Sequence, residues 1–577
     1  MLNRDWLVAN RGILLVVLLG AIVLLPALSF GLWEPWEPKY AQAAVEMNER
    51  GDYVTPYYRD VPRYSKPILT YWVIALSYGV FGINEFATRL PFVLFALSSI
   101  GVFTHCLTRL FSRTLGTLGG IVLLTSPMFH LLARQAMPDP LFVACLTMAL
   151  SFLALGLFEE QARGRRMLLF YVFSGLAVLS KGPLAVIILG SITGLYVLLT
   201  LDFAAGSWRG TLRSLWHLLF HRMKVHWGIP LFLLIAVPWY AYHLLTDEVF
   251  LERLRYDYLT RFSRPEGHHD GAVTYYIERL FYGLFPWTAL AAAAALCMRP
   301  PSGENLRRKQ LFFVCWFICP FLMFSASETK FSYYIVPALP PLAVLAAASL
   351  SAYLKDTQCR ARYFALPILA LGIFLLPARM LLADPAFLIG TITIKRSVNQ
   401  VFFADPSFAH PQMTYLVLFG VFAAILLLLA IVSFWKFRVY AVAGLCTVAV
   451  IMSAYNAQYL VVNLAPHKSQ KLVVAHLKTL MTGDDELAIF FPGKDVMVGR
   501  ERASIEGSAV FYTNDAIVEL NSLDAARRYY KDAGHGYCIV RKRYMRQLRN
   551  LFKEYDLTMN IVDESNYRFT AIEVRRE

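Results

Sequence analysis

The chain has 577 residues, of which 57% are hydrophobic and only 16% are charged, and its formal net charge is +15. So small a charged fraction beside so large an apolar one excludes an ordinary soluble globular protein. The basic balance does not indicate nucleic-acid binding, because the lysines and arginines are spread mostly over short segments between apolar runs and over the C-terminal end. Membrane proteins collect cations in cytoplasmic loops in this way.

Apolar stretches of the ~20 residues needed to cross ~30 Å of hydrocarbon recur along the chain, which indicates a polytopic α-helical membrane protein. The first stretch is longer than a signal-peptide core and has no small-residue cleavage site after it, so we interpret it as a retained helix. We predict about thirteen spans, a count open by one or two. They are residues 12–32, 86–109, 114–133, 140–158, 167–180, 183–201, 227–246, 279–298, 310–326, 332–354, 363–381, 412–434 and 438–460.

Loop charges predict the orientation of these spans. Lysines and arginines gather after each even-numbered span, for example at 163–166 and 209–224, and such loops stay in the cytoplasm together with the N terminus. The non-cytoplasmic side then receives the loop 33–85, the later polar motifs and the C-terminal tail. Ionisable motifs that converge from separate loops on one membrane face indicate a reaction site.

The first non-cytoplasmic loop opens with two carboxylates, Glu34 and Glu37. Either is a candidate to deprotonate or orient an acceptor; alternatively, both only favour the start of the next helix. Lys66, in the motif RYSKP, is a candidate phosphate ligand, although a lysine at a membrane boundary also commonly snorkels. Because Tyr and Trp are interleaved through the loop, we predict interfacial helices at about 38–50 and 67–82.

Three later motifs add candidates on the same face. Asp139, in PDP, is a second candidate catalytic carboxylate, and an N-cap role is compatible with that function. Lys181, in SKGP, is a candidate phosphate ligand or a snorkelling lysine. Lys330 and Tyr334, in TKFSYYIVP, are predicted to hold a phosphate oxygen, and a plain aromatic belt is the alternative for the tyrosine.

The segment 255–280 mixes cations and histidines. Arg261 and Arg264 are the better candidates here, as contacts to a phosphate. A divalent metal at the adjacent His268 and His269 is a weaker possibility, and no cofactor is otherwise indicated. The eight cysteines are scattered without a CxxC motif, which speaks against a thiolate metal site or a disulfide framework.

The tail from about residue 465 onward is less apolar and is predicted to be a small soluble α/β domain, following a transmembrane domain of residues 1–464. It contains no nucleophile elbow, P-loop or metal-ligand spacing, so we expect it to serve as a scaffold or to bind the acceptor. Its predicted helices are SQKLVVAHLKTLM, LDAARRYYKD and RQLRNLFKEYD, and its predicted strands are ELAIFF, SAVFY, YCIVRKR, NIVD and YRFTAIEV.

Taken together and in order, the motifs resemble those of the aminoarabinose lipid A transferases. These are bacterial relatives of the protein O-mannosyltransferases in the GT-C class of membrane glycosyltransferases. The resemblance covers roughly residues 10–480. It is carried by EPKYAQAAVEM, GDYVTPYY, RYSKPILTYW, TRLPFVL, PDP, SKGP, VPWY, RFSRPEGHH, FPW and KFSYYIVPALPP.

The resemblance implies roles for single residues. Glu37 matches the second acid of the family's opening pair, while Trp36 stands where the first acid is expected, so Glu37 alone or Glu34 would act. Asp139 matches the acid of the second loop, and Lys66 matches the phosphate-binding lysine. Tyr334 matches the tyrosine near the lipid phosphate.

Two further positions of the family pattern bear on arginine and metal ligands. Arg261 or Arg264 matches the phosphate-binding arginine, with the register left open. Ser65 occupies the position of an acid that binds zinc in some relatives, which argues against a family-type zinc site.

The resemblance also implies a reaction. The chain would transfer a sugar from an undecaprenyl phosphate donor, with inversion, at the periplasmic face of a bacterial inner membrane. The best candidate reaction is aminoarabinose-type transfer to a lipid A phosphate or a related envelope glycan. Alternatives are a flippase for lipid-linked sugars, an oligosaccharide ligase or polymerase, and a protein O-glycosyltransferase.

Overall fold

The computed structural model describes residues 4–201, 208–256, 274–297, 303–355 and 438–576, and isolated positions between 417 and 427. Within the last long range it leaves out residues 483–484, 493–496, 499–500, 503–506, 515 and 567. Contacts divide the chain into two compact units. Unit 1 contains residues 1–26 and 92–458, and unit 2 contains residues 27–91 and 459–577.

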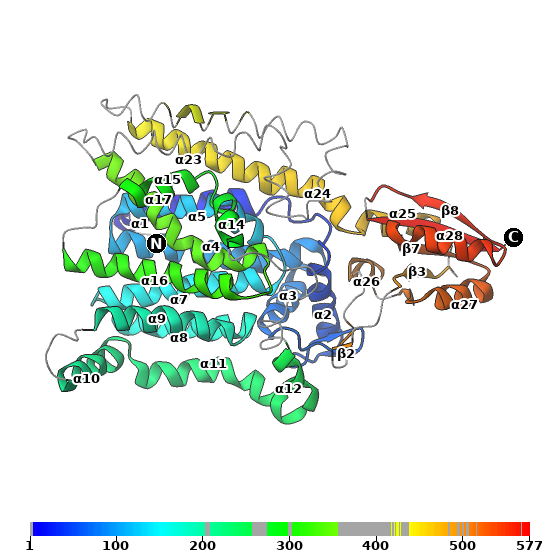
Figure 1. Ribbon diagram of the computed structural model, residues 1–577, viewed down its shortest axis with the longest axis horizontal. Coiled ribbons are helices and arrows are strands. Elements are labelled where there is room, and N and C mark those ends of the chain that lie inside the picture. The colour runs from blue at the N-terminus through cyan, green and yellow to red at the C-terminus, as the bar shows by residue number, and fades with distance from the viewer. Residues whose placement is uncertain are drawn as a thin grey trace. The chain divides into compact units, whose positions relative to one another are not determined.

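The described part of unit 1 is helical, and several of its long helices run side by side in Figure 1. They are α1 (Arg4–Leu24), α4 (Glu85–Leu110, whose first turns belong to unit 2), α5 (Arg113–Thr125), α6 (Pro127–Leu132), α7 (Pro138–Phe158), α8 (Arg163–Lys181), α9 (Leu184–Thr200), α10 (Trp208–Trp216), η1 (His217–Arg222), α11 (Val225–Thr246), α12 (Glu248–Arg255), α14 (Tyr275–Gly283), α15 (Thr288–Cys297), α16 (Glu304–Ala326), η3 (Ser332–Ala338), α17 (Leu339–Lys355), α23 (Arg438–Tyr455) and η6 (Asn456–Leu460).

Six helical stretches of the described chain are long and apolar enough to cross a bilayer, so the chain is a multi-pass membrane protein. They are Glu85–Leu110, Pro138–Phe158, Val225–Thr246, Glu304–Ala326, Ser332–Lys355 and Arg438–Lys468, each of which overlaps a predicted span. Shorter apolar helices include Val8–Leu24, Arg113–Thr125 and Leu184–Thr200. The predicted span 363–381 and most of 412–434 lie outside the described residues.

Three predicted spans are not continuous helices. The first helix ends at Leu24, two residues before Pro26, rather than near residue 32. The span 114–133 is divided at Ser126, directly before Pro127, and the span 279–298 is divided between α14 and α15, around Pro286. Proline has no amide hydrogen and its ring disfavours a helical residue before it, which explains all three interruptions.

Helices α7 and α8 form an antiparallel hairpin in unit 1. The short turn from Glu159 to Ala162 joins them, and they pack along their lengths. With 21 residues in α7 and 19 in α8, the start of α7 necessarily returns to the end of α8. Asp139 lies in the first turn of α7 and Lys181 is the last residue of α8, so the hairpin brings them to the same end.

Unit 2 begins with two helices, one at each place where the sequence predicts an interfacial helix. They are α2 (Glu37–Arg50) and α3 (Leu69–Phe81). Proline in the first turn and Glu37 at the positive end of the helix dipole favour the start of α2, and Gly51 ends it with a φ of 66°. Between the helices lies a two-stranded hairpin, β1 (Tyr57–Tyr58) and β2 (Val61–Pro62).

The rest of unit 2 comes from the C-terminal part of the chain. Its helices are α24 (Val461–Lys468), α25 (Lys471–Leu480), α26 (Gly507–Thr513), α27 (Leu523–Ala533), the short η7 (Lys542–Tyr544) and α28 (Met545–Lys553). Its strands are β3 (Leu487–Phe490), β6 (Val518–Leu520), β7 (His535–Arg541), β8 (Leu557–Asp563) and β9 (Phe569–Arg576), with a separate pair β4 (Met497–Val498) and β5 (Glu501–Arg502).

The five longer strands form one sheet in the order β6-β3-β7-β9-β8. β3 is parallel to β6 and β7, whereas β9 is antiparallel to β7 and β8. Side chains alternate between the two faces: Phe490 and Val540 join a core with α27 and α28, and Ile489 and Ile539 join a core with α25 and α26. A small helix-covered sheet domain is therefore present, as the sequence predicts.

One predicted strand of this domain is wrong. The run SAVFY forms most of helix α26, in which Ser508, Ala509 and Val510 are buried. A five-residue apolar run does not distinguish a strand from a buried helix, and packing decides between them. Here Gly507 places the helix start against α2, since a Cβ on it would lie 3.0 Å from Cγ of Lys39.

Candidate functional site

A buried ion pair at one end of the α7–α8 hairpin joins two of the candidate residues in unit 1. Nζ of Lys181 donates a short hydrogen bond to the Asp139 carboxylate. Both side chains are about nine-tenths buried, with 8% and 11% of their surface exposed. Asp139 is not the N-cap of α7, because that position is Met137, so its carboxylate serves the lysine instead. In such a low-dielectric place the pair interacts strongly.

Tyr334 completes this group. Nζ of Lys181 lies 4.1 Å from the centre of the Tyr334 ring and 5.4 Å from that of Phe142, which places the ammonium against the electron-rich face of the tyrosine. The short helix η3 holds Tyr334 next to Phe324 and Phe331, with ring centres 5.7 and 5.1 Å apart. Asp139, Lys181 and Tyr334, from three separate motifs, therefore meet; we call them the α7–α8–η3 cluster.

Lys330 lies in the loop that leads into η3. Its side chain is buried, and Nζ donates a hydrogen bond to the Ser327 carbonyl of the same loop. The phenol of Tyr276 donates to the Phe331 carbonyl, at 3.2 Å, and so fastens the next residue of the loop to α14. This contact positions the η3 segment that carries Tyr334.

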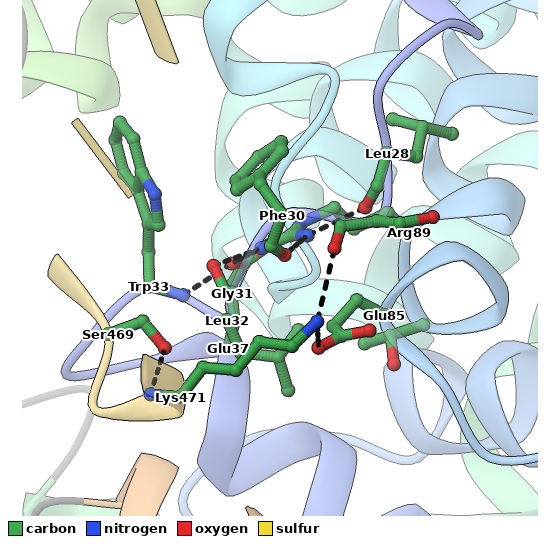
Figure 2. A network of polar contacts seen from close by, with 12 residues as sticks. Leu28, Phe30, Gly31, Leu32, Trp33, Glu37, Glu85, Arg89, Ser469 and Lys471 are labelled. Atoms are coloured by element: carbon green, nitrogen blue, oxygen red, sulfur yellow. Dashed lines mark hydrogen bonds and ion pairs between the residues drawn. The ribbon is translucent and has the colours of Figure 1, made fainter. Parts of the chain in front are cut away.

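The carboxylate of Glu37, in unit 2, is held in a buried ion pair. Arg89 donates from Nε to Oε1 at 2.9 Å and from Nη2 to Oε2 at 2.5 Å, and the Trp33 amide donates to Oε2 at 2.7 Å (Figure 2). The side chain of Arg89 is 0% exposed and that of Glu37 is 3% exposed. The arrangement anchors the start of α2.

Arg89 also organises the chain segment that precedes α2. It donates to the carbonyls of Leu28, Phe30 and Gly31, and its guanidinium carbon lies 3.6 Å from the centre of the Phe30 ring (Figure 2). In the sequence, Arg89 stands out only as part of the motif TRLPFVL, which gives it no predicted role. The sequence does contain a signal for a buried arginine with partners, since an arginine inside an apolar run of membrane-span length needs groups that compensate its charge.

Glu34 has a different environment from Glu37. Its Oε1 accepts a hydrogen bond from the Ser508 amide, and its Oε2 is buried without a hydrogen-bond partner among the described residues. Burial raises the pKa of Glu34, and the hydrogen bonds with Ser508 and the positive charges of Lys39 and Arg568 oppose that rise. A carboxyl group with a raised pKa is suited to take up and release a proton near neutral pH. The contact with Ser508 could not be predicted from the sequence, because 474 residues separate the two.

Glu85 and Lys471 form another ion pair that the sequence analysis did not identify. Their charged atoms are 2.6 Å apart (Figure 2). The Tyr512 hydroxyl donates to the same carboxylate at 3.0 Å. The Leu32 amide donates to that hydroxyl at 2.8 Å. Within unit 2, residues 27–91 are thus fastened to the C-terminal helices by polar contacts.

Lys66 is half-buried, and its Nζ donates to the Ser65 carbonyl. The nearby hairpin turns at Arg59 and Asp60, both with positive φ, and the Glu46 carboxylate accepts from both turn amides, at 2.7 and 3.2 Å. Glu46 therefore stabilises the fold of the loop that carries Lys66.

The remaining predicted site residues lie outside the part of the chain that the structure describes. Arg261, Arg264, His268 and His269 all lie in the undescribed range 257–273. Within the described ranges, no three His, Cys, Asp or Glu side chains are grouped closely enough to hold a metal ion. Six cysteines have described side chains, and all six are free thiols.

Residues 65–242 match the family model of dolichyl-phosphate-mannose-protein mannosyltransferases. An undecaprenyl phosphate-alpha-4-amino-4-deoxy-L-arabinose arabinosyl transferase of Pectobacterium atrosepticum is 29% identical over 348 residues, which cover 59% of each protein. The relative of that name from an Enterobacter species is 29% identical over 58% of each. The matched region thus spans under two thirds of the length of these relatives.

The crystal structure of ArnT from Cupriavidus metallidurans bound to undecaprenyl phosphate superposes with a TM-score of 0.72, covering 97% of each chain at 21% identity. The chain has the GT-C fold. The resemblance to the aminoarabinose transferases that the motifs indicate is thereby confirmed, and so is the predicted fold class, apart from the number of spans.

Proposed function

We propose that this GT-C protein is a glycosyltransferase that moves a sugar from a polyprenyl phosphate to an acceptor at the periplasmic face of the bacterial inner membrane. The observation that carries the proposal is the α7–α8–η3 cluster, which joins a buried carboxylate, an ammonium and a tyrosine at one end of a membrane helix hairpin. Charged groups at such a depth are costly, so they indicate function.

The chemistry suited to this cluster is a direct displacement with inversion. An acceptor oxygen forms a bond to the anomeric carbon while the bond from that carbon to the phosphate oxygen breaks, and polyprenyl phosphate leaves with the electron pair. Lys181 stabilises the negative charge that grows on the departing phosphate, and Tyr334 holds the ammonium in place. Asp139 positions the lysine and, with a hydroxyl acceptor, takes up the proton.

The names of the relatives support the choice of donor and acceptor. They are named as arabinosyl transferases that use undecaprenyl phosphate-aminoarabinose, and the similar crystal structure contains undecaprenyl phosphate. We infer that the donor here is a sugar on undecaprenyl phosphate, with aminoarabinose as the first candidate. The first candidate acceptor is a lipid A phosphate, which is already ionised and needs little help from a base.

The site residues of the other segments are proposed on sequence grounds. Lys66, Lys330 and either Arg261 or Arg264 are proposed as further ligands of the donor phosphate. Glu34 is the better of the two candidate carboxylates in the first loop, since Glu37 is engaged by Arg89 whereas burial leaves one Glu34 oxygen without a partner among the described residues. The N terminus is proposed to be cytoplasmic, and the tail from residue 465 to be a periplasmic domain.

The test is a transfer assay with the purified full-length protein. Radiolabelled undecaprenyl phosphate-aminoarabinose is supplied in detergent with lipid A, and the labelled products are separated by thin-layer chromatography. We expect the label to move to lipid A. If the label stays on the donor with every sugar and acceptor tried, and reconstituted vesicles show donor crossing the membrane, the protein is a flippase and the transferase proposal is wrong.

The family-model match favours one second candidate, a protein acceptor. That model describes protein mannosyltransferases and covers residues 65–242, which include Asp139, Lys181 and Lys66. A protein O-glycosyltransferase would use the same donor chemistry, but its hydroxyl acceptor requires a true base. In the same assay, label recovered in periplasmic protein rather than in lipid A would select this alternative.

A further inference from the structure

A cavity of about 730 Å³ lies in unit 1 at the end of the α7–α8 hairpin opposite Asp139 and Lys181. Phe158, at the end of α7, and Arg163, at the start of α8, both line it. A helix of the length of α7 spans about 30 Å, so the cavity is remote from the α7–α8–η3 cluster. Its other walls come from α9, α10, η1 and α16.

The lining of this cavity is strongly basic. Four arginines contribute to it against two glutamates, and they are Arg163, Arg213, Arg222 and Arg308. Among the described residues, these two exposed glutamates pair with lining arginines, Glu160 with Arg163 at 3.7 Å and Glu304 with Arg308 at 2.5 Å. Such pairs are weak and exchange readily with a stronger anion.

Arg213 and Arg222 differ from the other two arginines. In the described ranges neither of them lies within ion-pair distance of a carboxylate, although both face the cavity. Arginine binds phosphate oxygens with two parallel N–H donors, which makes phosphate the anion that such a lining fits best.

The other half of the lining is apolar, with Leu157, Phe158, Leu201 and Leu218 among its residues. Helix α10 forms part of the cavity wall, and it also carries large exposed apolar side chains. Trp208, Leu212 and Trp216 recur at every fourth residue and are 70%, 51% and 58% exposed. Tryptophans on one face of a basic helix are typical of helices that lie in a membrane interface.

We propose that this cavity binds the phosphate headgroup of an anionic phospholipid from the surrounding bilayer, with α10 lying in the interface beside it. The arginines of the cavity can contact a phosphate group, and its apolar walls can contact the adjoining hydrocarbon of a lipid. This combination fits a phospholipid better than a wholly polar anion. Its size falls within the usual range of ligand pockets, about 300–1,000 Å³. The four arginines come from three basic segments of the sequence that meet at this cavity, and anionic lipids attract such segments.

Native mass spectrometry of the full-length protein tests this proposal. The protein is released from nanodiscs of mixed phosphatidylglycerol and phosphatidylcholine, and the retained lipids are counted. We expect wild type to retain phosphatidylglycerol selectively. In the double variant Arg213→Gln with Arg222→Gln, the amount of retained phosphatidylglycerol should fall about tenfold or more. The charge-preserving variant Arg213→Lys with Arg222→Lys should keep the preference for phosphatidylglycerol.

A matched control removes the same charge from the same loops outside the cavity. Arg165 and Arg209 are exposed and do not line it, so Arg165→Gln with Arg209→Gln should retain phosphatidylglycerol as wild type does. Equal loss in the control would show a diffuse surface effect and overturn the proposal. Calorimetry with inorganic phosphate, on protein in phosphatidylcholine nanodiscs, tests whether a soluble anion occupies the cavity instead. Tight phosphate binding without a preference for phosphatidylglycerol would also overturn the lipid proposal.

Thermal unfolding in detergent guards against misfolded variants, and the single variant Arg213→Gln provides a milder change at an exposed side chain. We expect it to melt as wild type does and to lose part of the lipid preference. None of these measurements depends on sugar transfer, so the lipid site and the proposed reaction stand or fall separately.

Discussion

The guanidinium of Arg89 contacts both carboxylate oxygens of Glu37, at 2.9 and 2.5 Å, in a place where neither side chain reaches solvent. The same arginine binds three carbonyls of the segment before α2. A carboxylate so engaged is suited to fixing the start of α2 rather than to accepting a proton from a substrate. The motif that the sequence marks as catalytic therefore contains a structural residue.

The first prediction follows from this pair. Glu37→Ala leaves the Arg89 cation buried without its partner, which costs about 3–5 kcal/mol of unfolding free energy. Glu37→Gln should lose less, because its amide oxygen still accepts a hydrogen bond from Arg89, which keeps its bonds to the three carbonyls. Glu304→Ala breaks an exposed pair and serves as control, with a loss below about 1 kcal/mol. Denaturant unfolding of the purified variants measures these differences; a fully stable but inactive Glu37→Ala protein would restore Glu37 as a catalytic candidate.

The second prediction concerns Glu34 and pH. Burial raises the pKa of Glu34 above its ordinary value of 4.5, so its contribution to stability is complete below that pH and is lost as the pH rises through the folded-state pKa. Glu34→Gln keeps an acceptor for the Ser508 amide but cannot ionise. We expect this variant to melt at a higher temperature than wild type near neutral pH and to show no advantage at about pH 4.

Thermal melts of both proteins across this pH range provide the measurement for Glu34. Glu160→Gln, at a side chain that is 89% exposed, is the control and should change neither curve. A Glu34→Gln protein that is less stable than wild type at neutral pH would mean that the ionised carboxylate stabilises the fold.

The third prediction tests Lys181 as a phosphate ligand. Lys181→Met removes the ammonium of the α7–α8–η3 cluster, so affinity for undecaprenyl phosphate should fall about tenfold or more, because charge-assisted contacts are lost. Lys309→Met is the matched control, since Lys309 donates to the Leu110 carbonyl and is not part of the cluster. Binding is measured with the purified variants by microscale thermophoresis. Equal affinity for Lys181→Met and wild type would assign Lys181 to a structural role with Asp139.

The fourth prediction separates the ring of Tyr334 from its hydroxyl. The ammonium of Lys181 lies 4.1 Å from the ring centre, and such contacts are worth about 0.5–2 kcal/mol. Tyr334→Leu should therefore weaken donor binding about threefold to thirtyfold, while Tyr334→Phe keeps most of it. If both variants lose the same amount, the hydroxyl itself contacts the phosphate, as the motif alone indicates.

The sequence predicts helix boundaries well where proline and glycine mark them. Helix α2 begins at Glu37 beside Pro38 and ends before Gly51, within one residue of the predicted range. The breaks near Pro127 and Pro286 carry the same signal, but hydropathy averaged over twenty residues conceals them. The predicted strand at SAVFY fails because only packing against α2 makes that run a helix.

The candidate site was predictable in part. Helices α7 and α8 have similar lengths and a short connection, which already places Asp139 and Lys181 at the same end of the hairpin. Their motifs mark both residues as candidates for the site. No sequence pattern predicts their direct ion pair, because the motifs mark Asp139 as a catalytic carboxylate and Lys181 as a phosphate ligand. The contacts of Glu34 with Ser508 and of Glu85 with Lys471 connect distant parts of the chain, and no local pattern indicates them.

The most direct test of the proposed reaction is the single-turnover rate of sugar transfer by Asp139→Asn, measured beside wild type with saturating undecaprenyl phosphate-aminoarabinose and lipid A. Asparagine is nearly the same size but cannot pair with the Lys181 cation or accept a proton. We predict that the rate falls at least about a hundredfold, because Lys181 loses the carboxylate that positions it, while the variant still folds, with a lower melting temperature than wild type, and still binds undecaprenyl phosphate. A rate equal to that of wild type would contradict the assignment of catalysis to the α7–α8–η3 cluster.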